Sequence, residues 1–402
     1  MNTSSPYLPN LTPLRGIAAL LVVFFHADLM LLNGQLFLLR YPDSHLVEKL
    51  YLMVDFFFVL SGFILFHVYT TWFKDGVNGS SFKKFTVARF ARVYPLHFFT
   101  LVYVVIAWSI FIQTGVPGGP FMNSFNTWVS IPTNILLIQS MNVHDWFSWN
   151  SASWSISTEW WMYMIFPFFV GPFLKLNTVG RIFVFFACIG GYLLIMLYLQ
   201  QFVTFPEALS FIKPAKPQID INVGYQFGFV RCICGFVLGM LAYLLYKDEI
   251  GKNLFGNGWT IILLTLAMLV CFHFGVLDVI SVCFFPCIIL SAAYGSSKIN
   301  TICTTKPMQR IGDWSFSIYL VHQPIIFTFG YILLYVNRKS PGNWIPTLPV
   351  MWAWIICILF IALTLLLSSY TYKYVEVPAR KWINKKFAGG RYEAQVKPVP
   401  IS

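Results

Sequence analysis

Residues 12–32 read TPLRGIAALLVVFFHADLMLL, a stretch of 21 residues that is apolar almost throughout. An α-helix needs about 20 such residues to cross a bilayer, so the stretch predicts a membrane-spanning helix with Thr12 as N-cap and Pro13 as its first residue. Similar runs recur along all 402 residues. Hydrophobic residues make up 57% of the chain and charged residues only 10%, where a soluble domain carries about 25% charged residues. The sequence therefore predicts an all-α polytopic membrane protein.

Ten apolar segments are candidate spans: residues 12–32, 50–73, 93–114, 159–174, 181–202, 223–246, 258–275, 277–296, 314–336 and 349–372. Basic residues favour the cytoplasmic side of a membrane. With the N-terminus in the cytoplasm, twenty of the 27 Lys and Arg residues flank inner ends, six lie in outer loops, and Arg231 lies within a span. This bias predicts ten spans with both termini cytoplasmic. The apolar run 135–138 is too short to span and predicts a re-entrant or interfacial segment.

The chain carries a formal net charge of +12 and eight cysteines. In a soluble protein this charge would indicate a nucleic-acid partner, but in a membrane protein it marks the cytoplasmic side, so we expect no nucleic-acid binding. The cysteines lie mostly in apolar segments, without a C-x-x-C pair or a Cys/His cluster at metal-ligand spacing. We interpret them as small core residues and expect neither disulfides nor a metal site.

Ionisable side chains within spans are costly and are therefore candidates for function. Arg15 and His26 lie eleven residues apart in the first predicted span. At 100° per residue this spacing puts both on one helix face, about 16 Å apart along the axis. Arg15 would then lie at the cytoplasmic mouth and His26 near the middle of the bilayer. The alternative interpretation is an interfacial anchor and a packing histidine.

Two further arginines, Arg89 and Arg92, open the third predicted span. Residues at i and i+3 share a helix face, and paired guanidinium groups suit phosphate oxygens. Taken alone, this pair is more typical of a plain positive-inside anchor.

His322 in the ninth predicted span would lie about 12 Å deep if its helix enters from the cytoplasm near Trp314. This depth is similar to that of His26. Two histidines at one depth could take and return a proton near neutral pH.

Three more ionisable residues lie in or beside spans. Glu159, at the outer start of the fourth predicted span, is either a helix cap or a ligand for a polar acceptor. Asp55 lies in the outer part of the second span and Arg231 in the middle of the sixth. Both need partners, and they could pair with each other or with Glu159.

Together these stretches resemble the membrane acyltransferase-3 family, which includes enzymes that O-acetylate bacterial surface polysaccharides. The resemblance runs from Leu11 to about Lys386. It rests on six motifs in order, which are LRGIAA at 14–19 with His26, DFFFVLSGF at 55–63, Arg89-x-x-Arg92 before Tyr94-Pro95, WSISTE at 154–159, SFSIYLVH at 315–322, and YVEVP at 374–378 with Arg380-Lys381-Trp382. The chain departs from the family at Thr12-Pro13, where an Asp-Gly is usual, and at Trp160-Trp161, where a second acidic residue often follows Glu159. No role for those acidic neighbours carries over.

The resemblance implies an enzyme of the bacterial inner membrane that moves an acyl group, usually acetyl, from cytoplasmic acyl-CoA to a hydroxyl of an exported or surface glycan. Arg15, Arg89 and Arg92 would hold the donor phosphates, with no metal. The acceptor would enter from the opposite side near Glu159, Asp55 and Arg231. His26 would be the base and His322 its helper, with Glu159 as the third catalytic residue. The membrane domain would cover residues 1–386, followed by a cytoplasmic tail, 387–402.

A multi-span solute or proton-coupled transporter is the main alternative, because it too would carry buried charges. The absence of detectable repeat halves favours the enzyme. The acceptor, the acyl chain and the oligomeric state stay open, as does the choice between direct transfer and an acyl-enzyme on a histidine.

Overall fold

The computed structural model describes residues 7–32, 43–214, 218–295, 301–337 and 349–388, and every regular element within them is a helix. In chain order these are α1 (Leu11–His26), η1 (Ala27–Leu31), η3 (Glu48–Leu52), α2 (Met53–Phe73), α3 (Gly79–Ile112), α4 (Gly119–Phe125), η4 (Trp128–Ser130), α5 (Ile131–Ile135), η5 (Ser151–Ser153), α6 (Trp154–Leu174), α7 (Thr178–Leu197), η6 (Leu199–Phe202), η7 (Glu207–Ile212), α8 (Gly228–Lys247), α9 (Lys252–Phe255), α10 (Gly258–His273), α11 (Asp278–Tyr294), α13 (Lys306–Val336), α14 (Val350–Thr371), η8 (Tyr372–Glu376) and α15 (Val377–Phe387). The all-α prediction is confirmed for these residues. Of the predicted tail 387–402, residues 389–402 lie outside the described part.

Seven helical segments are long and apolar enough to cross a membrane, and each overlaps one of the ten predicted spans. They are Leu11–Leu31, Glu48–Phe73, Gly79–Ile112, Thr178–Leu197, Gly228–Lys247, Lys306–Val336 and Val350–Phe387. The other three predicted spans also form helices. However, α10 and α11 have only 16 and 17 residues, and α6 begins with the polar run Ser155, Ser157, Thr158 and Glu159. A polytopic membrane protein is confirmed, whereas the number ten and the side of the termini stay predictions.

Helix α2 lies at the centre of the molecule and packs against α8 along most of its length. It is apolar on all sides, as expected of a helix surrounded by other helices. Glycines allow the close approach, because a Cβ at Gly62 would collide with the backbone carbonyl of Phe236 and one at Gly239 with that of Val59. Small residues at such crossings let two helix backbones come into direct contact.

A second close crossing joins α1 to α13, which are distant in sequence. A Cβ at Gly16 would lie 2.7 Å from the backbone carbon of Ile311, and one at Gly312 would collide with the carbonyl of Thr12. Since only glycine fits at both points, the two backbones can come into direct contact. This crossing sets the rotation of α1 relative to α13, and with it the positions of their inward-facing side chains.

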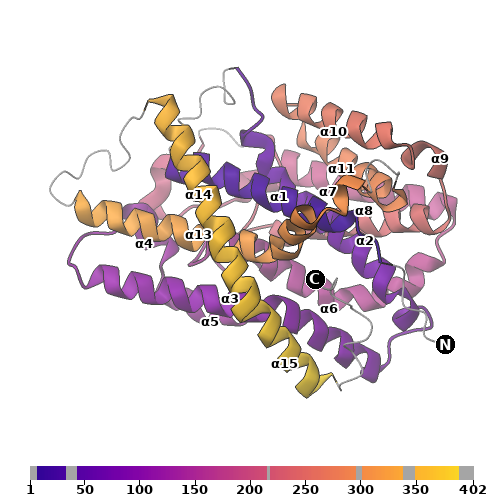
Figure 1. Ribbon diagram of the computed structural model, residues 1–402, viewed down its shortest axis with the longest axis horizontal. Coiled ribbons are helices and arrows are strands. Elements are labelled where there is room, and N and C mark those ends of the chain that lie inside the picture. The colour runs from indigo at the N-terminus through magenta and orange to yellow at the C-terminus, as the bar shows by residue number, and fades with distance from the viewer. Residues whose placement is uncertain (1–6, 33–42, 215–217, 296–300, 338–348, 389–402) are drawn as a thin grey trace.

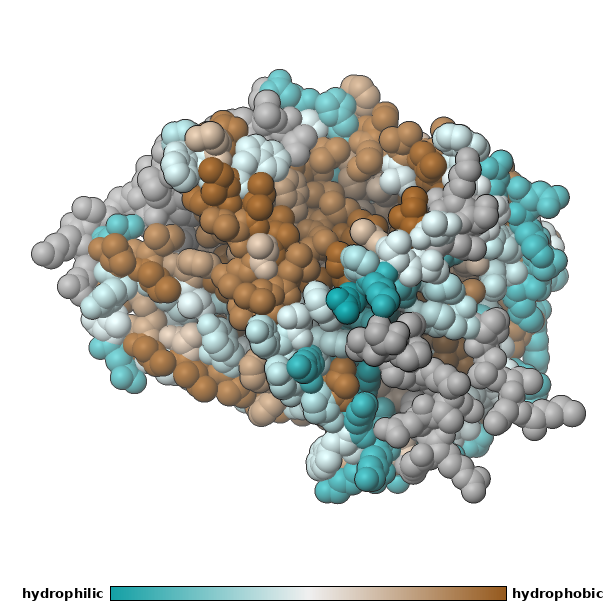
Figure 2. Space-filling view, viewed as in Figure 1, coloured by the Kyte–Doolittle hydropathy of each residue, from teal (hydrophilic) through white to brown (hydrophobic). Residues whose placement is uncertain are grey.

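Helices α14 and α15 form one long rod that crosses the view in Figure 1, with α13 and α3 nearby. Apolar side chains cover the middle and left of the face seen in Figure 2, whereas hydrophilic ones gather towards the right and lower edges. This distribution fits a protein whose apolar belt contacts lipid.

The segment between α3 and α6 forms only short helices, and none of them is long enough to span a membrane, as the sequence predicts. Several of its polar side chains are buried, and some of these contact α3 and α13. The Asn150 amide, for example, donates to the Thr100 hydroxyl (3.0 Å) and to the Leu320 carbonyl (2.9 Å). The segment therefore braces the two long helices that carry Arg89, Arg92 and His322.

Candidate functional site

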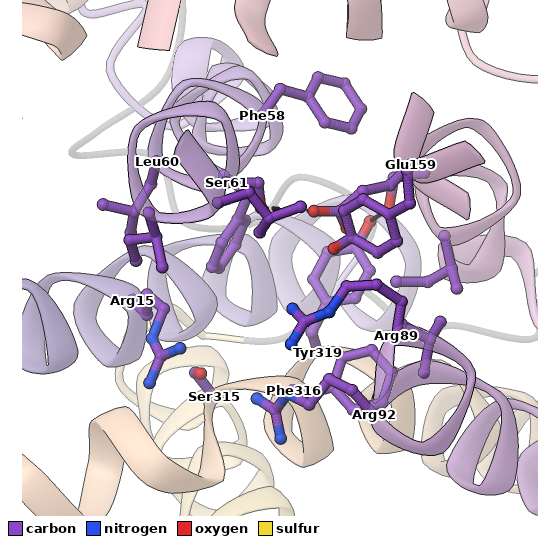
Figure 3. A pocket seen from close by; sticks show the side chains of 17 residues that line it. Arg15, Phe58, Leu60, Ser61, Arg89, Arg92, Glu159, Ser315, Phe316 and Tyr319 are labelled. Atoms are coloured by element: carbon purple, nitrogen blue, oxygen red, sulfur yellow. Dashed lines mark hydrogen bonds between the residues drawn. The ribbon is translucent and has the colours of Figure 1, made fainter. Parts of the chain in front are cut away.

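A cavity of about 120 Å³ lies between α1, α2, α3, α6 and α13. Four of the predicted site residues line it: Arg15, Arg89, Arg92 and Glu159. In Figure 3, Ser61 and Glu159 face each other on one side, Arg15 and Arg92 lie across from them, and Arg89 lies between. Apolar side chains of α2 complete the lining. The cavity is thus a small cationic chamber with one carboxylate in its wall.

The two α3 arginines reach the cavity from one helix face, as their i, i+3 spacing predicts. Nη2 of Arg89 donates to the Tyr69 hydroxyl (3.0 Å), and its guanidinium lies over the rings of Tyr69 and Tyr163 at 5.3 and 5.9 Å. Arg92 forms an ion pair with Glu376 and lies 5.2 Å from the centre of the Phe316 ring. These contacts fix both side chains before any ligand is bound.

Arg15 is held less tightly. Its Nε is buried and makes no hydrogen bond to any of the described residues. A buried guanidinium N–H without an acceptor is costly, because it has lost water and gained no partner. Because Arg89 donates to Tyr69 and Arg92 pairs with Glu376, Arg15 is the arginine of the three whose guanidinium is most open to an anionic or carbonyl ligand.

Glu159 lies in the second turn of α6, five residues after the helix begins at Trp154, so it is not the N-terminal cap. Its Oε1 accepts a hydrogen bond from Oγ of Ser61 on α2. The sequence places Glu159 on the opposite side from the arginines, but the structure places it in the same cavity as Arg89. The reason is that α6 starts earlier than the predicted span, which moves Glu159 from the helix end to its interior.

His26 and His322 are in contact, with Nδ1 of His26 3.3 Å from Nε2 of His322. Nδ1 of His26 also lies 3.0 Å from the carbonyl of Val22, one turn earlier in α1. His322 is fully buried and His26 only partly. Neither lines the cavity, but Tyr319 bridges the two places. Its ring lies 6.0 Å from that of His322, and its hydroxyl is 2.7 Å from the Ser155 hydroxyl in the cavity wall.

Asp55 and Arg231 pair with each other, which is one of the two arrangements that the sequence leaves open. Nη2 of Arg231 lies 2.5 Å from Oδ2 of Asp55, and Nε lies 3.0 Å from Oδ1. The guanidinium also donates to the carbonyls of Val223 and Tyr51, and the two side chains are 1% and 0% exposed. This closed ion pair ties α2 to α8 and lies outside the cavity lining.

The model of the acyltransferase domain matches residues 9–369, which is most of the chain. The chain belongs to the acyltransferase-3 family. Similar proteins include acyltransferase MdmB of Streptomyces mycarofaciens, 29% identical over 345 residues and 81% of each chain. Peptidoglycan O-acetyltransferase OatA of Listeria monocytogenes is 23% identical over 94% of this chain and 56% of its own length. O-acetyltransferase OatA of Staphylococcus aureus is 23% identical over 96% and 59%.

This acyltransferase thus spans little more than half the length of the OatA proteins that it matches. No solved structure gives a significant match. The resemblance predicted from the six motifs is confirmed at the level of the family, and so is the prediction of an acyltransferase. No group of three or more metal-ligating side chains occurs among the residues that the structure describes.

In the acyltransferase fold the predicted residues separate into three places: the cavity with Arg15, Arg89, Arg92 and Glu159, the histidine pair of His26 and His322, and the ion pair of Asp55 and Arg231. The cavity and the histidine pair both lie beside Tyr319.

Two residues of the acyltransferase site receive no role from the sequence. Glu376 is 1% exposed and accepts hydrogen bonds from Arg92 and from the Ser317 hydroxyl (3.1 Å). The sequence offers a weak signal for it, since it is an acidic residue a few positions beyond the last predicted span, which ends at residue 372. Ser61 lies in the DFFFVLSGF motif but is not ionisable, and a serine in an apolar helix is common, so its contact with Glu159 in the structure is what singles it out.

Proposed function

We propose that this acyltransferase moves a short acyl group, acetyl above all, from acyl-CoA to a hydroxyl of a cell-surface or exported glycan. The observation that supports it best is the convergence of Arg15, Arg89 and Arg92 on one small cavity that also holds a carboxylate. Guanidinium groups bind phosphate oxygens through charge-assisted hydrogen bonds. A donor that carries phosphates on a long flexible arm fits this arrangement.

The size of the cavity supports a donor that inserts only its reactive end. Sites that enclose a drug-sized ligand measure about 300–1,000 Å³, whereas this cavity measures about 120 Å³. The thioester and a short acyl chain fit inside it, and the nucleotide stays at its mouth. Arg15, whose Nε makes no hydrogen bond within the described residues, would bind the phosphates of the donor at this mouth.

The histidine pair is suited to the acceptor half of the reaction. In the neutral tautomer of His26 that donates from Nδ1 to the Val22 carbonyl, Nε2 is left as the acceptor for a hydroxyl proton. His322 contacts the same ring and can share the positive charge that follows. A general base of this kind contributes roughly 10²–10⁴-fold to a rate. Glu159, which is hydrogen-bonded to Ser61, completes the proposed catalytic set.

A glycan acceptor is proposed because two similar proteins are named O-acetyltransferases, one of them for peptidoglycan. Asp55 and Arg231 are expected from the sequence to lie towards the acceptor. Since their polar atoms bond to each other and to neighbouring groups of the protein, we propose that they support the site by holding α2 against α8 and do not touch the acceptor.

We propose that the protein lies in the bacterial inner membrane, with ten spans and both termini in the cytoplasm. The donor would enter from the cytoplasmic side. The support is the bias of basic residues described above. Fusions of a reporter that is active only outside the cytoplasm, placed after residues 75, 175 and 250, would remain inactive. A reporter that became active at any of these three loops would overturn the assignment.

Acetyl transfer itself is tested with purified protein in lipid vesicles, acetyl-CoA and a glycan acceptor. We expect acceptor-dependent release of free CoA thiol and an acetyl ester on the glycan by mass spectrometry. Glycan or solute uptake without thiol release would favour the transporter.

The donor assignment has a sharper test. Replacing Arg15 by Gln removes a charge-assisted hydrogen bond, so we expect the KM for acetyl-CoA to rise about tenfold. The acetyl thioester of N-acetylcysteamine lacks the nucleotide and its phosphates, so its KM should not change in the same variant. An equal rise for both donors would remove Arg15 from phosphate binding.

A further inference from the structure

Ser61 and Glu159 form a hydroxyl–carboxylate pair inside the cavity that the proposed function assigns to the donor. The serine hydroxyl donates to Oε1 of the carboxylate. Both side chains line the cavity (Figure 3), which is the space that the proposed function gives to the thioester. A weak nucleophile becomes reactive when an adjacent base accepts its proton. The pair therefore has the two components that covalent catalysis requires.

Both members of the pair are held in place by the fold. Gly62, next to Ser61, lies directly against the backbone carbonyl of Phe236, which fixes the rotation of α2. On the other side, the Ser157 hydroxyl (2.8 Å) and the Trp161 indole (2.9 Å) both donate to the Leu137 carbonyl, which fixes α6. The Ser61–Glu159 contact is thus set by two braced helices and not by flexible loops.

The same cavity supplies positive charge for the oxyanion that such an attack creates. The guanidinium of Arg89 lines it beside Glu159. Donors already in place where negative charge develops are an effective form of transition-state stabilisation. The histidines are not positioned for this step, because neither lines the cavity.

We infer that Ser61 is the nucleophile of a covalent half-reaction and carries the acyl group as an ester between donor and acceptor, with Glu159 as its base. This inference rests on the proposed function, since it takes acyl-CoA as donor. Oγ of Ser61 attacks the thioester carbon, the Oγ–C bond forms and the C–S bond breaks. Glu159 takes the Oγ proton and delivers it to the sulfur, which leaves as free thiol. In the second half an acceptor hydroxyl attacks the ester carbon, and its proton ends on Oγ as the serine is released.

The test uses the full-length protein and acetyl-CoA labelled in the acetyl group, without acceptor. We expect a burst of about one thiol per chain and protein-bound label that hydroxylamine removes, located at Ser61 by mass spectrometry. Ser61→Ala should lose both the burst and the label, and Glu159→Gln should slow the burst at least a hundredfold. Ser61→Cys should still take up label, now as a thioester that hydroxylamine cleaves faster. Ser109→Ala is the matched control, because that hydroxyl donates to the Val105 carbonyl of its own helix and does not line the cavity.

The inference is overturned if folded Ser61→Ala transfers acetyl at the wild-type rate, or if the label lies on another residue. It is also overturned if the wild-type protein acetylates an acceptor but binds no label covalently. Each of these results leaves the proposed acetyl transfer intact. Failure of the proposed function looks different: wild-type protein then releases no thiol even with acceptor present.

Discussion

Nδ1 of His26 lies 3.3 Å from Nε2 of His322, and the centres of the two rings are 4.9 Å apart. The contact depends on the glycine crossing of α1 and α13 at Gly16 and Gly312. Two imidazoles this close act as one unit, because a proton accepted by either ring affects the other. The pair is therefore expected to respond to mutation as a unit.

Replacing His26 by Ala should lower kcat for acetyl transfer at least a hundredfold, because it removes the proposed base. Replacing His322 by Gln should have a similar effect. The double variant should be no slower than the slower single one, since residues that act together show non-additive losses. Thiol release by each purified variant measures these rates.

The control for this series is His45→Ala. The His45 ring is hydrogen-bonded to Glu48 (2.8 Å), the first residue of η3, and neither residue lines the cavity. Its rate should match the wild type. Additive losses from His26 and His322 would show that the two histidines work independently.

Arg92 and Glu376 allow binding to be separated from stability. Arg92→Ala leaves a carboxylate that is 1% exposed without its cation, and breaking a buried pair in this way costs about 3–5 kcal/mol. We expect a clear fall of the melting temperature in detergent and a higher KM for acetyl-CoA. The double variant Arg92→Ala/Glu376→Ala should regain most of the melting temperature and keep the high KM. A double variant with a normal KM would mean that Arg92 serves Glu376 and not the donor.

For the Asp55–Arg231 pair, in contrast to Arg92 and Glu376, we expect the double variant to regain activity as well as stability. Asp55→Ala leaves the 1%-exposed Arg231 guanidinium unpaired, and should destabilise the protein by about 3–5 kcal/mol. Replacing both residues by apolar ones of similar size, Asp55→Leu with Arg231→Met, should restore the melting temperature together with activity. If the folded double variant stays inactive, the two residues touch substrate, as the sequence first suggested.

Close packing of α2 against α8 is tested at Gly62. Gly62→Ala places a Cβ against the Phe236 carbonyl, and such overpacking costs roughly 1–3 kcal/mol. We expect a lower melting temperature and, because Ser61 is the next residue, lower activity. Gly190 in α7 has open space around it and is the matched control. Gly190→Ala should be neutral or stabilise by up to about 1 kcal/mol, because alanine favours the helix interior. Equal effects of the two changes would show that the crossing tolerates a side chain.

The sequence by itself determined the class of fold, the family and the residues worth testing. Membrane helices can be predicted locally, because each must carry its own run of apolar residues, and ionisable residues within such runs are conspicuous. Seven of the predicted spans overlap helices that are long and apolar enough to cross a membrane, although the helices that carry Arg89 and His322 begin earlier than predicted, at Gly79 and Lys306. The short α10 and α11 and the polar start of α6 show where this local rule no longer separates a span from another helix.

Only the tertiary structure decided which of these residues work together. Contacts between helices depend on crossing points and rotations, and these are set by a few glycines whose effect on a partner helix has no local signature. The sequence put His26 and His322 at one depth, but the α1–α13 crossing brings them into contact. It put Glu159 apart from the arginines, and the early start of α6 places it in their cavity beside Ser61. The pairing of Arg92 with Glu376 across 284 residues arises in the same way, from packing between segments that no local pattern connects.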